Sequence, residues 1–522
     1  MRAILIKLMW LCAIGLIALY LPALAEVNTA WIKTYDGNLD PPMYNCANKL
    51  VVDSQGNIYV TGFSQSHAID YDYDIVTIKY LPDGTIAWMN TYDGTTNISE
   101  MANGLVVTAG GEVYVTGRVY DYSGSGGNSN GFLIIKYLSN GDTAWVRQYN
   151  GDSNTGDYIS GLKVTAAGEV YAVGYCDTSY LFTFKYSSSG DLLWMRRYRP
   201  AEGKAFGGSV ETDDAGNVYV SGGQYLPAGP YYSPGVVLVY SSTGDTLGIH
   251  TYEIPGPSSV SLGQSVLRNG YLYVAGTCSR QNTDVDFFLM KMALNGDTVW
   301  TRAYDGASQI SYQKSDYCRF LLVDDEGNAF IIGYSYGEKD DFATIKYSPA
   351  GDILWVSRYD YKGWDDVPQA MAVDRSGSIY LSGYSERAIG KGDFFTLKLN
   401  ADGTPAWARR YSPEDNYNCA NAVGTDASGN VYAAGYSRST YDGKILTVIK
   451  YSPSTAILGD ANGDGEINVG DAVSLINYIF KAGPAPSPLE NADANCDSHV
   501  NVGDAIFLIN FIFKGGHPPN CM

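Results

Sequence analysis

Short stretches in which hydrophobic and polar residues alternate, each bounded by turn-forming residues, repeat along most of the chain. The clearest mark of one repeat is a tryptophan followed four residues later by a tyrosine, and successive marks lie 49 to 57 residues apart. The marks are Trp31 and Tyr35, Trp88 and Tyr92, Trp145 and Tyr149, Trp194 and Tyr198, Trp300 and Tyr304, Trp355 and Tyr359, and Trp407 and Tyr411. One further unit keeps Tyr252 but has Gly248 in the tryptophan position. The pattern therefore indicates eight copies of one structural unit.

Each unit has the same internal order, which predicts four short strands. After the tryptophan strand come a variable loop, an alternating strand such as Leu50–Asp53, a turn, and a strand such as Ile58–Gly62. A second variable loop leads to a strand such as Asp74–Tyr80, and a turn then returns to the next tryptophan. Four antiparallel strands per unit predict one blade of a β-propeller. We expect an all-β fold with eight four-stranded blades; seven blades, with the unit around Gly248 irregular, is the alternative.

The ring is expected to close through the two ends of the repeat region. The last unit has strands near Val431 and Val448, but no tryptophan strand follows Tyr451. The strand Trp31–Tyr35 precedes the first complete unit, so it is free to supply the missing strand. Such closure joins the ends and removes exposed strand edges.

Alternation also predicts where the repeated side chains point. In Ile78–Tyr80 the two hydrophobic residues share one face, and Lys79 projects to the other. Lys136, Lys185, Lys291, Lys346, Lys398 and Lys450 repeat this arrangement. We expect the repeated aromatic residues to fill the space between packed sheets. In its order of strands, aromatic residues and glycines, the segment from Trp31 to Tyr451 resembles the tandem β-propeller repeat family of secreted bacterial proteins.

The last 63 residues contain one polar pattern twice, starting at Asp460 and again at Asp493. Oxygen-bearing side chains fall at loop positions one, three, five, nine and twelve, and the carbonyl of position seven is expected to point inward. This spacing lets a tight loop surround a hard cation with six or seven oxygens, so two calcium ions are predicted. The predicted ligands are Asp460, Asn462, Asp464, Glu466, Asn468 and Asp471, and then Asp493, Asn495, Asp497, His499, Asn501 and Asp504.

A helix is predicted after each loop but not before it. Apolar residues recur at helical spacing after both loops, at Val473, Ile476 and Phe480 and at Ile506, Ile509 and Phe513, and Gly483 and Gly515 are expected to end the helices. The segments before the loops contain prolines instead. Two such loop-and-helix units resemble the type I dockerin, from Asp460 to Lys514. One departure is Ser498, which replaces the turn glycine Gly465 of the first copy, so we expect the second loop to bind calcium more weakly.

The dockerin resemblance implies a cohesin-type protein module as partner, and secreted, often polysaccharide-degrading, assemblies as the setting. The partner-contacting positions of that family correspond to Val469, Gly470, Asn477, Tyr478 and Lys481, and to Val502, Gly503, Asn510, Phe511 and Lys514. Because the two sets are nearly identical, the module is expected to bind in two orientations related by a half-turn.

The amino terminus predicts export. Arg2 and Lys7 precede an apolar stretch, and Ala23–Ala25 forms a small-x-small cleavage site. The apolar stretch is too short for a membrane span, and nothing comparable occurs later. We therefore divide the chain into a signal peptide (1–25), a propeller (26–455) and a dockerin (459–522), and expect a secreted, extracellular or cell-surface protein.

Charge and cysteine content add two constraints. The net charge is −20 and becomes −22 without Arg2 and Lys7, which argues against nucleic acid and anionic lipid as partners. Cys12 leaves with the signal peptide, and a bridge between Cys496 and Cys521 is expected within the dockerin. The remaining cysteines are expected to be buried free thiols, because equivalent positions of different blades lie too far apart for a bridge. They are Cys46, Cys176, Cys278, Cys318 and Cys419.

No catalytic set of residues emerges from the sequence. The four histidines are scattered, so no Ser-His-Asp arrangement is evident. The acidic pairs Asp340–Asp341 and Asp365–Asp366 have the chemistry for glycoside hydrolysis, but their place in the loops of an acidic protein favours solvated side chains.

Two function classes remain compatible with the sequence. One is a non-catalytic binding or scaffolding propeller, whose ligand is a polysaccharide or another surface protein. The other is a glycoside hydrolase carried by a dockerin and acting in polysaccharide catabolism. Tyrosine-rich loops, with Tyr73 and Tyr120 among their residues, are the candidate ligand face. A pocket with paired carboxylates would favour the hydrolase, whereas uneven charge and exposed tyrosines would favour the binding protein.

Overall fold

The structure is a computed structural model. It describes residues 27–37, 44–65, 72–94, 98–121, 130–150, 156–176, 180–227, 233–254, 258–280, 285–306, 315–336, 339–414, 416–438, 443–453, 458–464, 466–481, 483–486, 489–497, 499–516 and 519. The predicted signal peptide (1–25), the turn residues Gly465 and Ser498, and Cys521 lie outside these residues. The chain divides into two compact units, one spanning Thr29–Ser452 and the other containing the residues from Pro453 onward.

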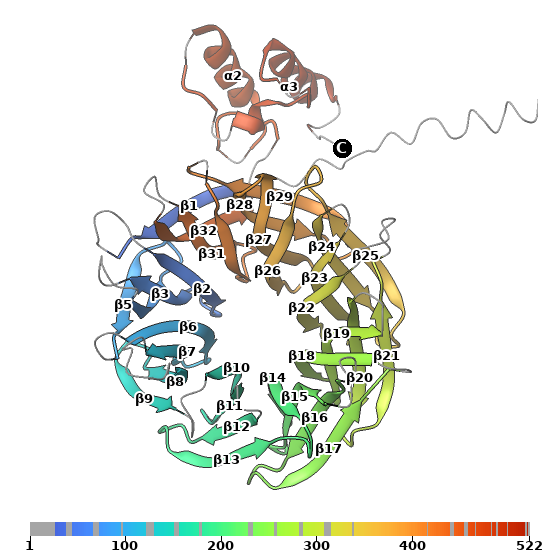
Figure 1. Cartoon of the computed structure of the whole chain (residues 1–522). Helices are drawn as coiled ribbons and strands as arrows, with labels where there is room; N and C mark the ends of the chain where they lie inside the picture. The colour runs from blue at the N-terminus through green and yellow to red at the C-terminus, as the bar shows by residue number, and fades with distance from the viewer. Residues whose placement is uncertain are drawn as a thin grey trace, which may run out of the picture. The chain divides into compact units, whose positions relative to one another are not determined.

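The first unit is a ring of eight four-stranded sheets, which confirms the eight-bladed propeller (Figure 1). Blade 1 contains β2 (Asn45–Val52), β3 (Ile58–Gln65), β4 (Tyr73–Tyr80) and β5 (Ile86–Tyr92). Blade 2 contains β6 (Ile98–Val107), β7 (Val113–Asp121), β8 (Asn130–Tyr137) and β9 (Thr143–Tyr149). Blade 3 contains β10 (Asp157–Val164), β11 (Val170–Cys176), β12 (Leu181–Tyr186) and β13 (Leu192–Tyr198). Blade 4 contains β14 (Lys204–Thr212), β15 (Val218–Tyr225), β16 (Gly235–Tyr240) and β17 (Thr246–Tyr252).

The remaining blades follow the same order. Blade 5 contains β18 (Ser258–Arg268), β19 (Tyr271–Arg280), β20 (Val285–Ala293) and β21 (Thr298–Tyr304). Blade 6 contains β22 (Asp316–Val323), β23 (Ala329–Tyr336), β24 (Asp340–Tyr347) and β25 (Ile353–Tyr359). Blade 7 contains β26 (Asp366–Val373), β27 (Ile379–Ala388), β28 (Lys391–Leu399) and β29 (Pro405–Tyr411). Blade 8 contains β30 (Cys419–Thr425), β31 (Val431–Arg438), β32 (Lys444–Pro453) and β1 (Val27–Tyr35).

The strand order of blade 8 confirms the predicted closure of the ring. Its sheet runs β1-β32-β31-β30, so the first strand of the chain completes the last blade. The Trp31 ring lies 6.0 Å from the Tyr432 ring in its own blade and 6.3 Å from the Tyr80 ring in blade 1. The unit around Gly248 forms a regular blade, so the seven-bladed alternative does not apply.

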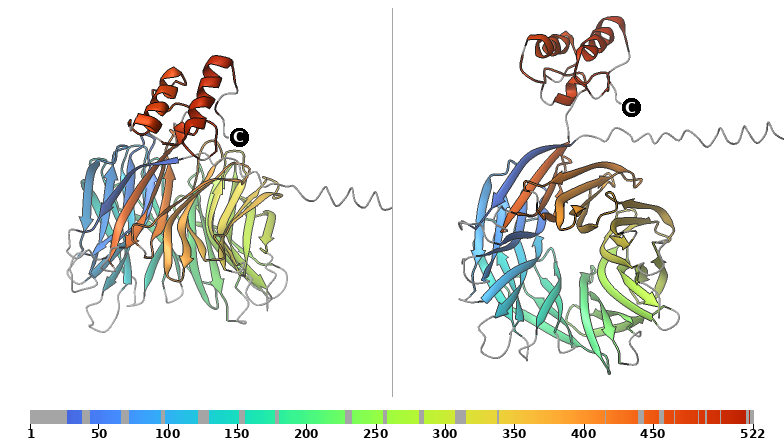
Figure 2. Two further views of the ribbon diagram at one scale, coloured as in Figure 1. Left: turned by 90° about the horizontal axis from the view of Figure 1, so that it is seen from above. Right: turned by 45° about the horizontal axis from the view of Figure 1, so that its top comes forward.

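The hydrophobic core lies between neighbouring blades, because each sheet buries side chains on both faces. Between blades 3 and 4, Val173 and Leu181 pack against Val220 and Val236, and all four side chains are fully buried. The strands run between the two faces of the ring, as the side view in Figure 2 shows. Short turns such as residues 53–57 lie at one face, which we call the turn face. The opposite ends of the strands define the other face, which we call the loop face.

An inter-blade clamp holds the outer rim of the ring at the turn face. In most blades the tryptophan of the outer strand donates its indole N–H to a turn carbonyl of the next blade. The pairs are Trp31 and Pro82 (3.3 Å), Trp88 and Ser139 (3.2 Å), Trp145 and Ser188 (3.1 Å), Trp194 and Ser242 (3.1 Å), Trp300 and Pro349 (3.1 Å), and Trp355 and Ala401 (3.0 Å).

The repeated lysines strengthen this clamp. Lys136, Lys185, Lys291 and Lys450 donate to the same carbonyls as the tryptophans of their blades, at 3.0 to 3.2 Å. The turn glycine of the next blade lies against the indole: a Cβ on Gly190 (φ +84°) would lie 2.8 Å from Trp145 Cδ2. The repeated aromatic residues and lysines therefore join the blades, and no ligand is needed to explain them.

Blade 4 replaces the clamp with a different contact. Gly248 and Val239, which are paired between β17 and β16, stand where other blades have tryptophan and lysine. The His250 ring packs against the turn glycine Gly296 of blade 5, so closely that a Cβ there would clash. Tyr252 also donates its hydroxyl to Gly296 O at 3.0 Å. Two ring contacts thus compensate for the missing indole.

A β-bulge recurs at one position of every innermost strand. The bulge residues are Asn48, Asn103, Ser160, Gly208, Gly263, Arg319, Gln369 and Asn421. Three of them tie neighbouring blades, because Asn421, Asn48 and Asn103 donate their amides to carbonyls of the next blade at 2.8 to 3.1 Å. In blade 4 a glycine is required, since a Cβ on Gly208 would lie 2.5 Å from Gly263 O of blade 5.

None of the five cysteines of the propeller forms a disulfide, as expected, and four of the five are buried. Burial raises the pKa of the Cys46 and Cys318 thiols to about 12, because the thiolate loses its hydration. These thiols therefore stay protonated near neutral pH.

The second unit contains α2 (Val469–Lys481), the short 3-10 helix η1 (Leu489–Ala492) and α3 (Val502–Lys514). Leu475 and Leu508 are fully buried in its core, together with Ala472 and Ala505. Asn501 caps α3 by accepting the N–H of Gly503, and Gly515 ends this helix in the left-handed conformation, as expected. None of the described helices is long and apolar enough to cross a membrane.

If β1 closes the ring, deleting residues 26–36 should destabilise the propeller strongly. The deletion opens the edge of β32 and removes the Trp31 contacts, and burial of a large aromatic side chain contributes about 3–5 kcal/mol. We expect a much lower melting temperature by tryptophan fluorescence, or aggregation. Deletion of residues 458–522, which contain no tryptophan, is the control and should leave propeller melting nearly unchanged. Equal melting of the amino-terminal deletion and the parent would contradict the contribution of β1.

Candidate functional site

In the first polar loop of the second unit, aspartate side chains accept hydrogen bonds from backbone N–H groups of the same loop. Asp460 Oδ1 accepts the N–H groups of Gly463 (2.8 Å) and Asp464 (3.1 Å). The two carboxylate oxygens of Asp471, which is fully buried, accept Asn462 N at 3.0 Å and Asn468 N at 2.8 Å. These bonds fold the loop back on the start of α2 and gather its acidic residues.

The second loop repeats this geometry. Asp493 Oδ1 accepts Asp497 N at 3.0 Å, and the buried Asp504 accepts Asn495 N (3.1 Å) and Asn501 N (2.8 Å). One carboxylate oxygen from each of Asp493, Asp497 and Asp504 lies within 4.8 Å of the others. The loop thus brings together three of the predicted metal ligands.

The acidic residues of both loops repel one another. Burial raises the pKa of Asp471, and the charges of Asp460 and Asp464 raise it further. Burial likewise raises the pKa of Asp504, with the charges of Asp493 and Asp497 adding to the effect. A divalent cation would remove this repulsion, and oxygen donors alone suit a hard ion such as Ca²⁺.

The remaining predicted ligands have local roles in the two loops. Asn468 and Asn501 accept the N–H groups of Gly470 and Gly503 at 2.7 Å, so their side-chain oxygens cap the helices. In calcium loops of this kind the side chain at the ninth position often binds calcium through a water molecule, which is compatible with this capping role. The other four predicted ligands are Asn462 and Asn495, whose amides donate to Asp464 and Asp497, and Glu466 and His499, whose backbone N–H groups donate to the same two aspartates.

The predicted partner-contacting residues lie along the two helices. Val469, Lys481, Val502 and Lys514 are exposed. Gly470, Asn477, Tyr478, Gly503, Asn510 and Phe511 are partly exposed. Neither set of residues is buried in the core, so both sets are available for contact with another protein.

Sequence reasoning missed part of this surface. Val473 and Phe480 on α2 and Ile506 and Phe513 on α3 are 52–66% exposed, although their spacing was attributed only to helix formation. Together with Val469 and Val502 they form two equivalent apolar strips, which we call the docking strips. The signal was present in the sequence, because Leu475 and Leu508 already define the core-facing side of each helix.

Only one cysteine of the predicted Cys496–Cys521 disulfide lies within the described residues. Cys496 is disulfide-bonded, at the second loop. Its expected partner, Cys521, lies outside the described residues.

In the propeller, the expectation of solvated acidic pairs is wrong for one residue of each pair. Asp341 is 7% exposed and Asp366 is fully buried, because both lie at the start of strands that pack at the junction of blades 6 and 7. Asp340 and Asp365 are partly exposed. Asp341, Asp360 and Asp366 form a carboxylate triad in which one oxygen of each residue lies within 4.8 Å of the others. Asp286, Asp305 and Asp316 form an equivalent triad at the junction of blades 5 and 6.

Burial dominates the electrostatics of the triad between blades 6 and 7. It raises the pKa of Asp366 to about 7 and that of Asp341 to about 6, and the charge of Asp360 adds to the second shift. Arg358 pairs with Asp341 at 3.2 Å, and Tyr361 N donates to Asp366 at 2.7 Å. The triad thus carries fewer than three charges near neutral pH.

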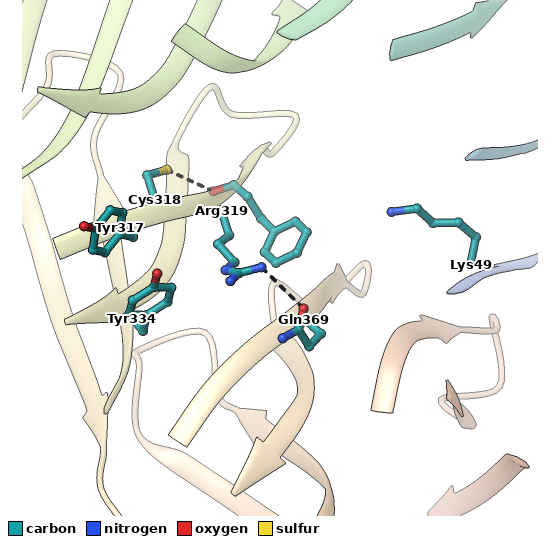
Figure 3. Close-up of a pocket in the computed structure, with 7 residues that line it drawn as sticks. Lys49, Tyr317, Cys318, Arg319, Tyr334 and Gln369 are labelled. Carbon is teal, nitrogen blue, oxygen red and sulfur yellow. Dashed lines mark hydrogen bonds between the residues drawn. The ribbon is translucent and has the colours of Figure 1, made fainter. Parts of the chain in front are cut away.

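A pocket of about 450 Å³ opens among the innermost strands (Figure 3). Its lining includes Lys49 from β2, Arg319 from β22 and Gln369 from β26, with Tyr317 and Tyr334 beside them. Because blades 1, 6 and 7 contribute to one pocket, it lies on the ring axis; we call it the axial pocket. No carboxylate is among its lining residues.

Comparison with known proteins identifies the second unit. Residues 458–513 match the family model described as the dockerin type I domain. The chain therefore carries a dockerin type I domain, preceded by an eight-bladed propeller. Dockerin domains bind calcium and attach to cohesin-containing assemblies, and proteins that carry them are typically extracellular.

Several solved structures resemble the propeller at low sequence identity. Among curated protein sequences, none matches this chain. Solved structures that resemble it include a virginiamycin B lyase from Staphylococcus aureus (11% identity, 68% of this chain and 96% of that chain, TM-score 0.37). A puromycin hydrolase (11% identity, 78% and 61%, TM-score 0.43) and a glucose dehydrogenase (15% identity, 56% and 97%, TM-score 0.32) are further examples. At these identities and TM-scores the similarities carry no argument about activity.

Because like charges meet in both loops, we expect the fragment 458–522 to lose helical structure when calcium is removed. Far-ultraviolet circular dichroism during titration from chelator into calcium measures this. A double substitution, Asp471→Asn with Asp504→Asn, should lower the calcium dependence, since it removes one buried charge from each loop. Helical signal that is identical in chelator and in calcium would contradict the expectation.

Asp366→Asn should reduce the pH dependence of propeller stability. The raised pKa of Asp366 means that the folded state binds this proton more tightly than the unfolded chain. Its stabilising contribution is complete below about pH 4 and is lost as the pH rises toward 7. The parent should therefore lose up to about 1.4 kcal/mol per pH unit over this range relative to the variant. Asn45 and Asn418 occupy the equivalent position in blades 1 and 8, so the substitution is tolerated by the fold.

Denaturation followed by tryptophan fluorescence at several pH values, in chelator, measures this difference. Asp352→Asn in an exposed turn is the matched control and should behave as the parent. A parallel pH dependence of the Asp366→Asn variant and the parent would refute the assignment.

Proposed function

We propose that this protein is an exported, non-catalytic binding or scaffolding propeller, attached by its dockerin to a cohesin-bearing extracellular or cell-surface assembly. The amino-terminal pattern supports cleavage after residue 25, with a propeller from 26 to 455 and a dockerin from 459 to 522. The twelve loop residues described above would hold two Ca²⁺ ions. The polysaccharide setting implied by the dockerin resemblance belongs to the same proposal.

The observation that carries the docking role is the pair of docking strips. Val473 is 52% exposed and Phe480 64%, while Ile506 is 54% exposed and Phe513 66%, so the two helices offer nearly equal apolar surfaces. Exposed apolar clusters of this kind mark sites of protein contact. Since each strip follows a calcium loop, loss of the ion would disorder the helix that presents it. Docking is therefore calcium-dependent, and each strip can serve it.

The axial pocket supports the binding role over the hydrolase. Glycoside hydrolysis needs two carboxyl groups that flank the scissile bond. The pocket offers Lys49 and Arg319 instead, with tyrosines beside them. The carboxylates that do meet, in the triads, are held in blade junctions by Arg358 and by backbone N–H groups.

Capture by purified cohesin modules tests the docking proposal. The full exported chain should bind a cohesin in calcium and not in chelator. Phe480→Asp and Phe513→Asp should each leave one strip intact and reduce affinity by only about twofold. The double variant should reduce it by about 100-fold or more, because burial of each large side chain is lost.

Leu489→Asp is the matched control, since Leu489 is an exposed apolar residue outside the two helices. It should bind as the parent does. Undiminished capture by the double variant would eliminate the docking strips as the contact surface, and capture in chelator would eliminate calcium dependence.

A further inference from the structure

The axial pocket is lined by positively charged residues, although the protein as a whole is acidic. The bulge residue and the residue after it in each of the eight innermost strands make sixteen positions. Lys49 and Arg319 are the only charged residues among them, although the chain has a net charge of −20. Both line the axial pocket, which is thus lined by two cations inside an acidic protein.

Neither cation forms an ion pair with an acidic residue of the described parts of the chain. The Lys49 side chain makes no hydrogen bond or ion pair with any described residue. Arg319 forms no such ion pair either, but it lies near enough to Asp340 that its charge partly offsets the rise that burial causes in the pKa of that carboxyl. Arg319 donates to Gln369 Oε1, at 3.4 Å. Figure 3 shows Lys49 on the opposite side of the pocket, pointing toward Arg319 and Gln369 across an open gap.

The Lys49 side chain is exposed, so its ammonium is accessible to a ligand. The protein around it lowers the pKa of Lys49 through partial loss of hydration. An anion beside Lys49 would favour its charged form, since opposite charges attract.

Two tyrosines give the pocket a flat wall beside the cations. The Tyr317 and Tyr334 rings stack with their centroids 5.1 Å apart, and the Arg319 guanidinium lies 5.3 Å from the Tyr334 ring. Tyr317 remains 39% exposed, so its ring is available to a ligand. Flat faces with polar edges suit a sugar ring, whose C–H groups pack on an aromatic side chain while its hydroxyls bond to groups such as Gln369.

We propose that the axial pocket binds a carboxylate-bearing sugar residue, that is, a uronic acid unit of an acidic polysaccharide. Arg319 pairs with the carboxylate, Lys49 faces the ligand from the opposite side of the pocket, Tyr317 supports the ring, and Gln369 bonds to its hydroxyls. Arginine suits this role because its planar fork matches a carboxylate. The volume of about 450 Å³ falls within the usual range for small-ligand pockets. This assignment deepens the proposed function, since it names the ligand class of a binding propeller.

Calorimetric titration of the full exported chain with trigalacturonate in calcium buffer tests the proposal. We expect binding that weakens with rising ionic strength, and no comparable binding of the neutral sugar cellotriose. Lys49→Gln and Arg319→Gln should each weaken binding about tenfold or more, as expected for loss of a charged hydrogen-bond donor. Tyr317→Leu should weaken it while leaving its dependence on ionic strength unchanged. Arg375→Gln, in an exposed turn of blade 7, is the control with the same charge change and should bind as the parent.

Tryptophan-fluorescence melting checks the folding of each variant. Lys49→Met is a second variant at this position, where the substitution breaks no hydrogen bond to a described residue. The proposal is overturned if trigalacturonate does not bind, if cellotriose binds equally well, or if inorganic phosphate competes as strongly, which would indicate a general anion site. Equal affinity of the Lys49→Gln variant and the parent would overturn it too. Cohesin capture by the same variants separates this outcome from the docking proposal, because the pocket residues lie outside the dockerin.

Discussion

The propeller depends on a hydrogen-bonded clamp in which one blade reaches a turn carbonyl of the next. The indole N–H of tryptophan can donate a hydrogen bond but the ring accepts none, so a buried tryptophan needs an acceptor such as a fixed carbonyl oxygen. Trp145 and Lys136 converge on Ser188 O, and the same pairing recurs around the ring. The clamp explains why tryptophan, lysine and the turn glycine repeat together. It also explains why blade 4, which lacks both donors, brings His250 and Tyr252 to the same turn.

This clamp lies at the turn face, so the loop face can vary without loss of the ring. The carboxylate triads, the tyrosine stack and the cations of the axial pocket come from strand ends and bulges nearer the loop face. The bulge repeats in every innermost strand, but its residue is free to differ. Glycine is needed where two backbones meet, as at Gly208, whereas Arg319 occupies the same position where the strands leave space. One backbone irregularity therefore allows close packing in blade 4 and places a pocket-lining side chain in blade 6.

The dockerin is governed by a different constraint, the repulsion among the carboxylates of each loop. Leu475 and Leu508 are the only large side chains of its core that are fully buried among the described residues, and side chains such as Ile476 and Phe507 pack partly buried around them. We therefore expect a bound ion to contribute to its stability. The same loops begin the helices that present Phe480 and Phe513. Metal binding, helix order and the apolar docking strips are thus linked through a few residues.

The sequence by itself determined the features that depend on short-range spacing. The polar residues from Asp460 to Asp471 lie within twelve residues, and the strands of a blade follow one another along the chain, so the two polar loops, the strands and the eight blades followed from pattern alone. Ring closure could be predicted because the last repeat lacks an outer strand, which β1 supplies. Burial was harder to predict, because Asp366 and Asp341 look like loop residues until two blades pack on them. The exposure of Phe480 required knowledge of which helix side Leu475 faces. Lys49 and Arg319 are 270 residues apart in the chain. Only closure of the ring places them around one pocket, since no local pattern fixes which residues of separate blades meet on the axis.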